Sequence, residues 1–248
     1  MSILSTIVTG KNPKPPRILL YGSEGVGKSS FAAAAPKAIF IQTEDGLGEI
    51  DCAKFPLAQN VTDVYNALVA LRDEEHDFQT VVIDTCDWLE RLIFADVCAE
   101  YHVRSIEKAD GGYGKGYSHA LTRWMALVDL MQELRDKRNM MIVLLAHAKI
   151  ERFEDPENAA YDRYTPRLHK LAAAYLTEWV DAVLFANKRL RVSKENDRTI
   201  AAPVGADGGE RIVRTIGGPA CIAKNRYGLP LEMPLDFNVV FEEIKKQF

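Results

Sequence analysis

The sequence has little cysteine and no pattern that would pair it. Cys52, Cys86, Cys98 and Cys221 are scattered through 248 residues. They lack the CxxC spacing of zinc sites and the density of a disulfide framework. Free thiols in a reducing cytosol are therefore the expected state.

The chain also lacks long apolar runs and an excess of positive charge. No run is long enough to span a bilayer, and residues 1–17 lack the basic start and apolar stretch of a secretory signal. The formal net charge is −4, so no overall positive field attracts nucleic acid. Any such contact needs local basic or aromatic loops, or many copies acting together. We expect a cytoplasmic protein with no membrane partner.

What is present is an alternation of short β-branched runs with helical segments. The runs predict strands over residues 17–21, 38–43, 80–84, 140–147 and 181–186. Between them, apolar residues at helical spacing predict helices that begin near Val61, Asp87 and His119. This alternation favours an α/β fold with a mostly parallel central sheet covered by helices.

The pattern changes after Ala186. Short strand-like runs over 188–196, 198–203, 211–216 and 220–225 have no helix between them, which predicts antiparallel strands at the C-terminal edge of the sheet. Two irregular stretches, 107–118 and 149–170, interrupt the core. We expect one domain over 1–248, with a core over about 17–230, an N-terminal arm over 1–16, a C-terminal segment over 231–248 and two long functional loops.

A phosphate-binding loop is the strongest motif. The stretch "YGSEGVGKSS" fits GxxxxGK[ST] and lies between a buried strand and an alanine-rich helix. Glycines let successive N–H groups wrap a phosphate, Lys28 reaches the β- and γ-phosphates, and the Ser29 hydroxyl binds Mg²⁺. The predicted nucleotide-binding residues are Gly22, Ser23, Glu24, Gly25, Val26, Gly27, Lys28, Ser29 and Ser30.

Three polar residues end other predicted strands, on the sheet edge that carries this loop. Asp84 is the candidate second Mg²⁺ residue, although an Asp in this place can also be a simple cap. Thr85 follows it where many P-loop motors have Glu, so Glu44 is the candidate catalytic base; the alternative is a solvated acid like Asp45. His147 is either a γ-phosphate sensor or a hydrogen-bonded cap.

The motifs "YGSEGVGKSS", "FIQTEDG", "VVIDT", "LLAH" and "IAKNRYGLP" occur in an order that resembles the RecA-type P-loop ATPase core. Within it the chain looks most like the small single-domain phage recombination ATPases that assist single-strand annealing. The similarity runs from Arg17 to Pro230. It implies a three-layer α/β fold, ATP and Mg²⁺ as cofactors, and, if the chain is phage-encoded, the cytoplasm of a bacterial host.

The resemblance also implies roles for single residues. Glu44 falls where the family keeps the glutamate that activates water, and His147 where it keeps a polar γ-phosphate sensor, usually Gln. Lys224 and Arg226 fall on a basic pair that reaches the ATP of the neighbouring subunit, as arginine fingers do. This implies a homo-oligomer, as a ring or a filament. The alternative for the pair is a solvated face of an edge strand.

RecA-like proteins hold single-stranded DNA with two loops, and the irregular stretches fall in both places. The first offers Tyr113, Lys115 and Tyr117 for stacking and phosphate contact, and the second offers Arg152, Arg163, Arg167 and Lys170. The second also carries five acidic residues, which leaves it almost no net field, so a surface loop without a ligand is the alternative.

The function expected is ATP-dependent single-stranded-DNA binding that promotes strand annealing or homologous recombination, with ATP hydrolysis stimulated by DNA. No further domain is visible, which favours loading or annealing strands with a single-strand-binding protein over autonomous strand exchange. The alternatives are a helicase-like or packaging motor, a small-molecule or nucleotide kinase, and a nonenzymatic ATP-gated DNA-binding module.

Overall fold

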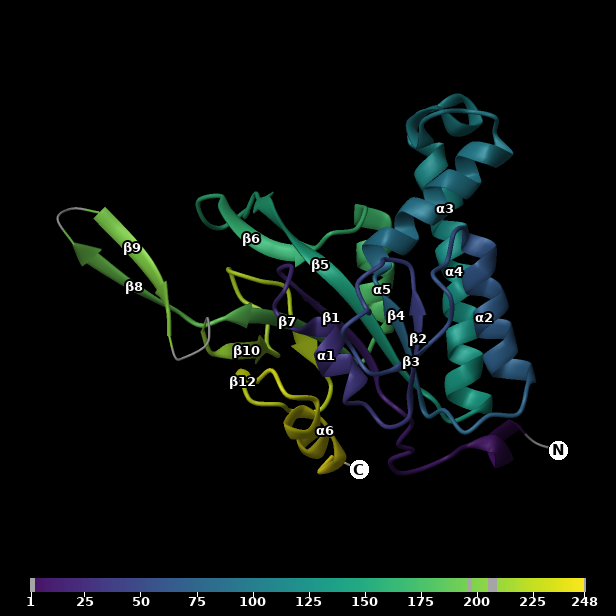
Figure 1. The fold of residues 1–248 in the computed structure, drawn as a ribbon, viewed down its shortest axis with the longest axis horizontal. Coiled ribbons are helices and arrows are strands. Elements are labelled where there is room, and N and C mark those ends of the chain that lie inside the picture. Colours follow the sequence, from purple (N-terminus) through teal and green to yellow (C-terminus); the bar gives the residue numbers. More distant parts are fainter. Residues whose placement is uncertain (1–2, 196–197, 205–208, 248) are drawn as a thin grey trace.

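The fold is a central sheet between two layers of helices, seen in a computed structural model that describes residues 3–195, 198–204 and 209–247 (Figure 1). The elements in chain order are η1 (Ile3–Thr6), β1 (Arg17–Gly22), α1 (Lys28–Ala33), β2 (Ala38–Gln42), β3 (Ala53–Lys54), α2 (Val61–Asp73), β4 (Thr80–Asp84), α3 (Cys86–Glu100), η2 (Ile106–Gly111), α4 (Lys115–Lys137), β5 (Met141–Phe153), β6 (Tyr161–Pro166), α5 (Lys170–Trp179), β7 (Ala182–Lys188), β8 (Leu190–Glu195), β9 (Arg198–Pro203), β10 (Arg211–Arg214), β11 (Lys224–Asn225), β12 (Glu232–Pro234) and α6 (Phe237–Lys245).

The sheet has the order β12-β10-β7-β1-β5-β4-β2-β3. Strands β7, β1, β5, β4, β2 and β3 are parallel, while β10 pairs antiparallel with β7 and β12 antiparallel with β10. The carboxyl ends of β1, β2 and β4 therefore meet at one edge, which β5 crosses at His147, and open α/β sheets bind ligands at this edge. The mostly parallel α/β fold with antiparallel C-terminal edge strands is confirmed.

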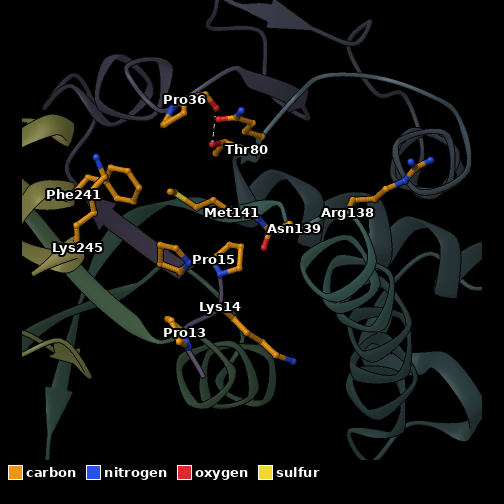
Figure 2. Close-up of a pocket in the computed structure, with 12 residues that line it drawn as sticks. Pro13, Lys14, Pro15, Pro36, Thr80, Arg138, Asn139, Met141, Phe241 and Lys245 are labelled. Carbon is orange, nitrogen blue, oxygen red and sulfur yellow. Dashed lines mark hydrogen bonds between the residues drawn. The ribbon is translucent and has the colours of Figure 1, made fainter. Parts of the chain in front are cut away.

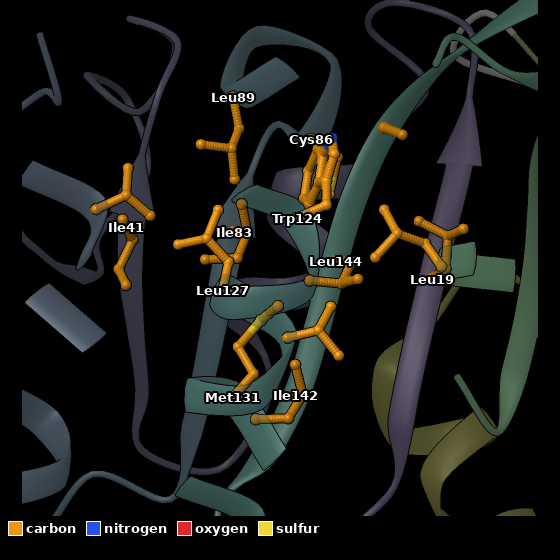
Figure 3. Packing of buried hydrophobic residues seen from close by; sticks show 14 of the residues in the cluster. Leu19, Ile41, Ile83, Cys86, Leu89, Trp124, Leu127, Met131, Ile142 and Leu144 are labelled. Carbon is orange, nitrogen blue, oxygen red and sulfur yellow. The ribbon is translucent and has the colours of Figure 1, made fainter. Parts of the chain in front are cut away.

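Alternate residues of the strands enter two separate cores. Leu19, Ile83 and Leu144 pack under α2, α3, α4 and α5, whereas their neighbours such as Leu20 and Val143 pack under α1 and α6. In Figure 3, Trp124, Leu127 and Met131 of α4 lie against the first of these faces, beside Ile83, Ile142 and Leu144. Strands buried on both faces explain the continuous apolar runs in the sequence.

Capping residues fix where helices begin. Asn60 accepts a hydrogen bond from the Asp63 amide, and the Asp63 side chain accepts from the Asn60 amide, which starts α2 with a capping box. Asp236 caps α6 by accepting from the amides of Asn238 and Val239. Neither helix needs a long apolar stretch to define its start.

The last strands differ in part from the expectation. The runs over 190–195 and 198–203 form a separate two-stranded sheet, β8-β9, which projects at the left of Figure 1 and does not join the edge of the central sheet. Strands β10, β11 and β12 alone, among the described residues after Lys188, complete the central sheet. Val213 of β10 and Met233 of β12 carry apolar side chains into the core.

The two stretches expected to be irregular loops are largely ordered elements. Residues 107–118 comprise most of η2 and the first turn of α4, joined by a short turn. Residues 149–170 continue β5 to Phe153 and return through β6, which pairs antiparallel with β5 beyond the central sheet. The second stretch is therefore a β-hairpin, not an open loop. In the described part of the chain, no helix is both long and apolar enough to cross a membrane.

Candidate active site

The phosphate loop joins β1 to α1 with the backbone that its glycines permit. Gly25 and Gly27 have φ angles of 68° and 106°, in the left-handed region that side chains disfavour. A Cβ on Gly22 would lie 2.4 Å from the carbonyl oxygen of Ala186, so only glycine fits beside β7. The sequence thus dictates the loop through both conformation and close packing.

The amine of Lys28 is folded back onto the loop. Its Nζ donates to the carbonyl oxygens of Gly22 and Ser23, at 3.2 and 3.0 Å. Burial lowers the pKa of this amine, against the opposing attraction of nearby carboxylates, the first of which is Asp84. Weak backbone partners leave the amine able to exchange them for phosphate oxygens.

Ser29 and Asp84 form a direct contact at the loop. The Ser29 hydroxyl donates to Oδ2 of Asp84 at 2.7 Å. Burial raises the pKa of the Asp84 carboxyl, and the hydrogen bond from Ser29 partly offsets this. A hydroxyl and a carboxylate side by side supply the hard oxygen ligands that Mg²⁺ prefers, so the residues present fit that ion.

Glu44 is attached to the same corner through the backbone. The amides of Thr43 and Glu44 donate to the Asp84 carbonyl at 2.7 and 3.3 Å. The Thr85 hydroxyl donates to Oε2 of Glu44 at 3.2 Å. Thr85 therefore orients Glu44, which follows the neighbouring strand β2. In many P-loop motors the position of Thr85 is itself a glutamate.

His147 lies in a charged network that the sequence did not reveal. Its Nδ1 is 3.1 Å from Oδ2 of Asp87, and its backbone amide donates to Oδ1 at 2.9 Å. Arg167 donates to the same Oδ2 from Nε and Nη2, and its Nη1 reaches Glu24 of the phosphate loop at 3.4 Å. Burial acts to raise the pKa of Asp87, but these hydrogen bonds outweigh it and hold the pKa well below its usual range.

These groups surround one cavity of about 380 Å³. It is lined by Gly25, Gly27, Lys28, Ser29, Ser30, Glu44, Gly46, Ile50, Asp84, Thr85, His147 and Arg211. The structure thus brings together Lys28, Ser29, Asp84, Glu44 and His147. Contrary to the sequence prediction, His147 does not end its strand, because β5 continues to Phe153; it lies in the cavity because it pairs with Gly22, the last residue of β1. The sequence reasoning missed Arg211, because it starts a strand after the parallel core and belongs to no motif.

Lys224 and Arg226 lie at the opposite end of the sheet. Lys224 lies opposite Val183 of β7. The residue before it, Ala182, lies opposite Ile18 near the start of β1, which places Lys224 at the amino end of the strands. Arg226 Nη1 is 3.2 Å from Oδ1 of buried Asp181. The pair cannot reach the ATP site of its own chain, so its action on a neighbour's site stays a prediction.

Asp181 also forms ion pairs with two other arginines at this end of the sheet. Arg17 donates to both of its carboxylate oxygens, and Arg135 Nη2 lies 3.0 Å from Oδ2. Burial acts to raise the pKa of Asp181, but hydrogen bonds from Arg17 and the charges of Arg17 and Arg135 lower it. The Asp181 carboxylate therefore faces three guanidinium groups, of which Arg17 and Arg135 are mostly buried and Arg226 is exposed.

The predicted DNA-contacting residues of the first stretch differ in their surroundings. Tyr117 stacks on His169 with ring centroids 3.9 Å apart and packs edge-on against Phe94. Lys115 Nζ is 3.7 Å from Asp110, while Tyr113 is fully exposed. Of these three residues, Tyr117 already uses its ring in contacts with His169 and Phe94.

The four predicted DNA-contacting cations of residues 149–170 lie in two different places. Arg167 belongs to the Asp87 network, whereas Arg152, Arg163 and Lys170 line a cavity of about 290 Å³ between the β5–β6 hairpin and α5. Arg163 lies over the Phe153 ring at 3.9 Å, and its buried Nε has no hydrogen-bond partner among the residues that the structure describes. DNA contact by these residues remains a prediction.

A larger cavity, of about 600 Å³, lies at the amino end of the strands (Figure 2). Pro13, Pro15 and Pro36 form part of its wall, where the Thr80 hydroxyl donates to the Pro36 carbonyl. Its three cations have acidic partners within the protein, in the pairs Lys14–Asp136, Arg138–Glu75 and Lys245–Glu242. It contains no phosphate-loop residue, so size alone does not identify the active site.

Comparison with known proteins agrees with this site. A family model described as an AAA domain matches residues 14–227. An SPbeta prophage-derived uncharacterized protein, YorG of Bacillus subtilis (strain 168), is 23% identical over 172 residues, which cover 68% of this chain. The chain spans 49% of the length of that relative. With the family model covering the phosphate loop and every strand from β1 to β11, the chain belongs to the AAA domain family of P-loop ATPases.

Proposed function

We propose that this protein is a Mg²⁺-dependent ATPase that oligomerises on single-stranded DNA and promotes strand annealing or homologous recombination. The observation that carries the proposal is the convergence of Lys28, the Ser29–Asp84 pair and Glu44 on one cavity. These groups supply phosphate binding, oxygen ligands and a base, which phosphoryl transfer to water requires.

The chain's residues divide the chemistry between them. Lys28, now bound to the loop carbonyls, would bind the β- and γ-phosphates, and Ser29 and Asp84 would hold Mg²⁺, which would neutralise phosphate charge. Glu44 accepts a hydrogen bond from Thr85, which aims the carboxylate and leaves its second oxygen for the proton of the attacking water.

The Asp87 network supports a link between ATP and the hairpin. His147 lines the ATP cavity, and Arg167 follows the last residue of β6. Both bind Asp87, and the Arg167 amide donates to the His147 carbonyl at 2.8 Å. A shift of His147 toward the γ-phosphate therefore acts directly on the base of the β5–β6 hairpin.

The cavity beneath this hairpin supports the choice of a nucleic-acid ligand. Lys149, Arg152, Arg163 and Lys170 line it, with Glu151 as the acidic residue among its lining. Cations beside an aromatic ring suit a phosphate backbone with stacked bases, and single-stranded binding relies on both. Two of these cations have acidic partners, since Lys149 Nζ lies 3.8 Å from Glu151 and Arg152 Nε lies 3.3 Å from Glu154. Arg163 and Lys170 have no acidic side chain within 4.0 Å among the described residues, so they are the cations left for a phosphate.

Oligomerisation is supported by the position of the basic pair. Lys224 and Arg226 lie on the surface at the amino end of the sheet, remote from Lys28. A head-to-tail neighbour presents its carboxyl-end ATP site to such a surface, so cations can stabilise charge in the transition state from outside. The prophage origin that the name of the Bacillus subtilis relative states fits a phage recombination role.

The test is ATP turnover by the purified protein with Mg²⁺, with and without single-stranded DNA at low salt, and with duplex DNA and RNA as comparisons. We expect single-stranded DNA to stimulate turnover and Lys28→Ala to abolish it. An annealing assay with two complementary strands, with and without a single-strand-binding protein, then tests the product. Absence of DNA binding in ATP and Mg²⁺ contradicts the proposal, and phosphate transfer to a nucleoside without DNA dependence assigns the chain to the kinases.

A further inference from the structure

Arg211 is a cation in the ATP cavity that no motif accounts for. It starts β10 beside the last residue of β7, Lys188, at the carboxyl end of the parallel strands. Its Nη1 lies 2.9 Å from the position that a Cβ on Gly27 would occupy, so the guanidinium lies directly over the phosphate loop. Its backbone is anchored by the Leu235 amide, which donates to the Arg211 carbonyl at 3.1 Å.

This guanidinium differs from the other arginines nearby. Arg189 is paired with Glu210 and Glu232, and Arg214 Nε lies 4.0 Å from Glu232. Among the described residues, no acidic side chain lies within 4.0 Å of the Arg211 guanidinium. An exposed cation without an acid, held over a loop that binds anions, is positioned for a phosphate.

The strand order shows which phosphates it faces. Asp84 ends β4 and Glu44 follows β2, on one side of β1, whereas β7 and β10 lie on the other side. The hydrolytic groups mark the γ-phosphate end of the cavity, and Lys28 spans the β- and γ-phosphates. Arg211 therefore faces the part of the triphosphate nearer to the nucleoside.

We propose that Arg211 binds the α- and β-phosphates of the nucleotide held by its own chain. This inference rests on ATP binding at the phosphate loop, part of the proposed function. It adds a nucleotide-binding residue from the antiparallel edge of the sheet, distinct in place from the Lys224–Arg226 pair. Because α- and β-phosphates persist in ADP, the contact is equal before and after hydrolysis.

The test compares Arg211→Gln with wild type by calorimetric titration with ADP and with a nonhydrolysable ATP analogue, both with Mg²⁺. We expect Kd to rise by roughly tenfold for both nucleotides, as for the loss of a charge-assisted hydrogen bond. In turnover assays KM for ATP rises by a similar factor while kcat is unchanged, since the contact is uniform through the reaction. Arg211→Lys keeps the charge but not the planar fork, and recovers part of the affinity.

Arg214→Gln is the matched control, because it removes a guanidinium from the same strand outside the cavity. Unchanged Kd values in Arg211→Gln overturn the inference, as does weaker binding of the ATP analogue with ADP unaffected. A lower kcat with an unchanged KM overturns it as well. None of these outcomes affects the proposed function, which fails separately if wild-type protein binds ADP but neither binds DNA nor hydrolyses ATP.

Discussion

The hydroxyl of Ser29 donates to the carboxylate of Asp84 over 2.7 Å, and so joins two motifs that lie 55 residues apart in the chain. In the nucleotide complex Ser29 and Asp84 would be the residues that hold Mg²⁺. Asp84→Asn keeps the hydrogen bond acceptor and removes the charge. ATP turnover should then fall by roughly 10² or more, and the Mg²⁺ concentration needed for half-maximal turnover should rise.

Ser29→Ala is the companion change, and it should raise the Mg²⁺ requirement without removing the carboxylate. The measurement is turnover across a Mg²⁺ titration, with circular dichroism to confirm folding. An unchanged Mg²⁺ requirement in both variants contradicts the assignment of the ion to this pair.

Glu44→Gln separates ATP binding from hydrolysis. The amide keeps the contact with Thr85 but cannot accept a proton, so kcat should fall by about 10²- to 10⁴-fold while ATP still binds. Asp45→Asn is the matched control, because it removes an exposed neighbouring acid that does not line the cavity. If the two variants lose similar activity, Glu44 is not the base.

Mixing two inactive variants tests the Lys224–Arg226 pair. Arg226→Ala should lower turnover by roughly 10³-fold if Arg226 acts as a finger. A mixture with Lys28→Ala should regain activity, because some interfaces then combine an intact site with an intact finger. At equal amounts, random assembly gives about a quarter of the wild-type interfaces.

The control for this experiment is the double variant Lys28→Ala/Arg226→Ala. Assembled alone, it should remain inactive at every protein concentration. Folding should survive the loss of Arg226, since Asp181 keeps Arg17 and Arg135 as partners. If the mixture shows no gain although both variants still oligomerise, the pair does not act between subunits.

Glu90 should make stability depend on pH. Burial raises its pKa from an ordinary value of 4.5 to about 7, although the His169 amide donates to it. Between these values the unfolded chain has lost this proton and the folded chain keeps it. Stability from this group is therefore fully present below pH 4.5 and is lost as the pH rises through 7.

Glu90→Gln stays neutral and should remove this dependence. Relative to wild type, its free energy of unfolding should be similar near pH 4.5 and higher by up to about 3 kcal/mol above pH 7. Urea unfolding at several pH values measures the difference, in which the other titrating groups cancel. A difference that stays constant with pH contradicts the prediction.

The sequence predicted the parallel core well because the strands are buried on both faces. The expected strand 80–84 coincides with β4. The ends of β1 and β2, with the point where β5 passes the end of β1, bring Lys28, Glu44 and His147 together. Apolar runs followed by a polar residue are a local signal, and parallel pairing places their ends at one edge.

The hairpin and the Asp87 network could not be predicted in the same way. Beyond the central sheet, β5 is largely exposed over residues 150–152, so no alternation of apolar and polar residues marks the strand. Asp87 and Arg167 are 80 residues apart, and neither belongs to a motif or a periodic pattern. Such ion pairs are fixed by tertiary packing, which local sequence does not encode.

The separation of the ATP cavity and the Lys224–Arg226 pair to opposite ends of one sheet gives any assembly built on them a direction. Such an assembly has two unlike ends if it stays open, and the subunit at one end holds ATP without a finger. If Arg226 acts as a finger between subunits, hydrolysis by that subunit should be slow until another subunit arrives. In such an open polymer, the addition of a subunit would also increase ATP turnover at the end it joins. A closed ring has no end subunit, so none of its ATP sites would lack a finger.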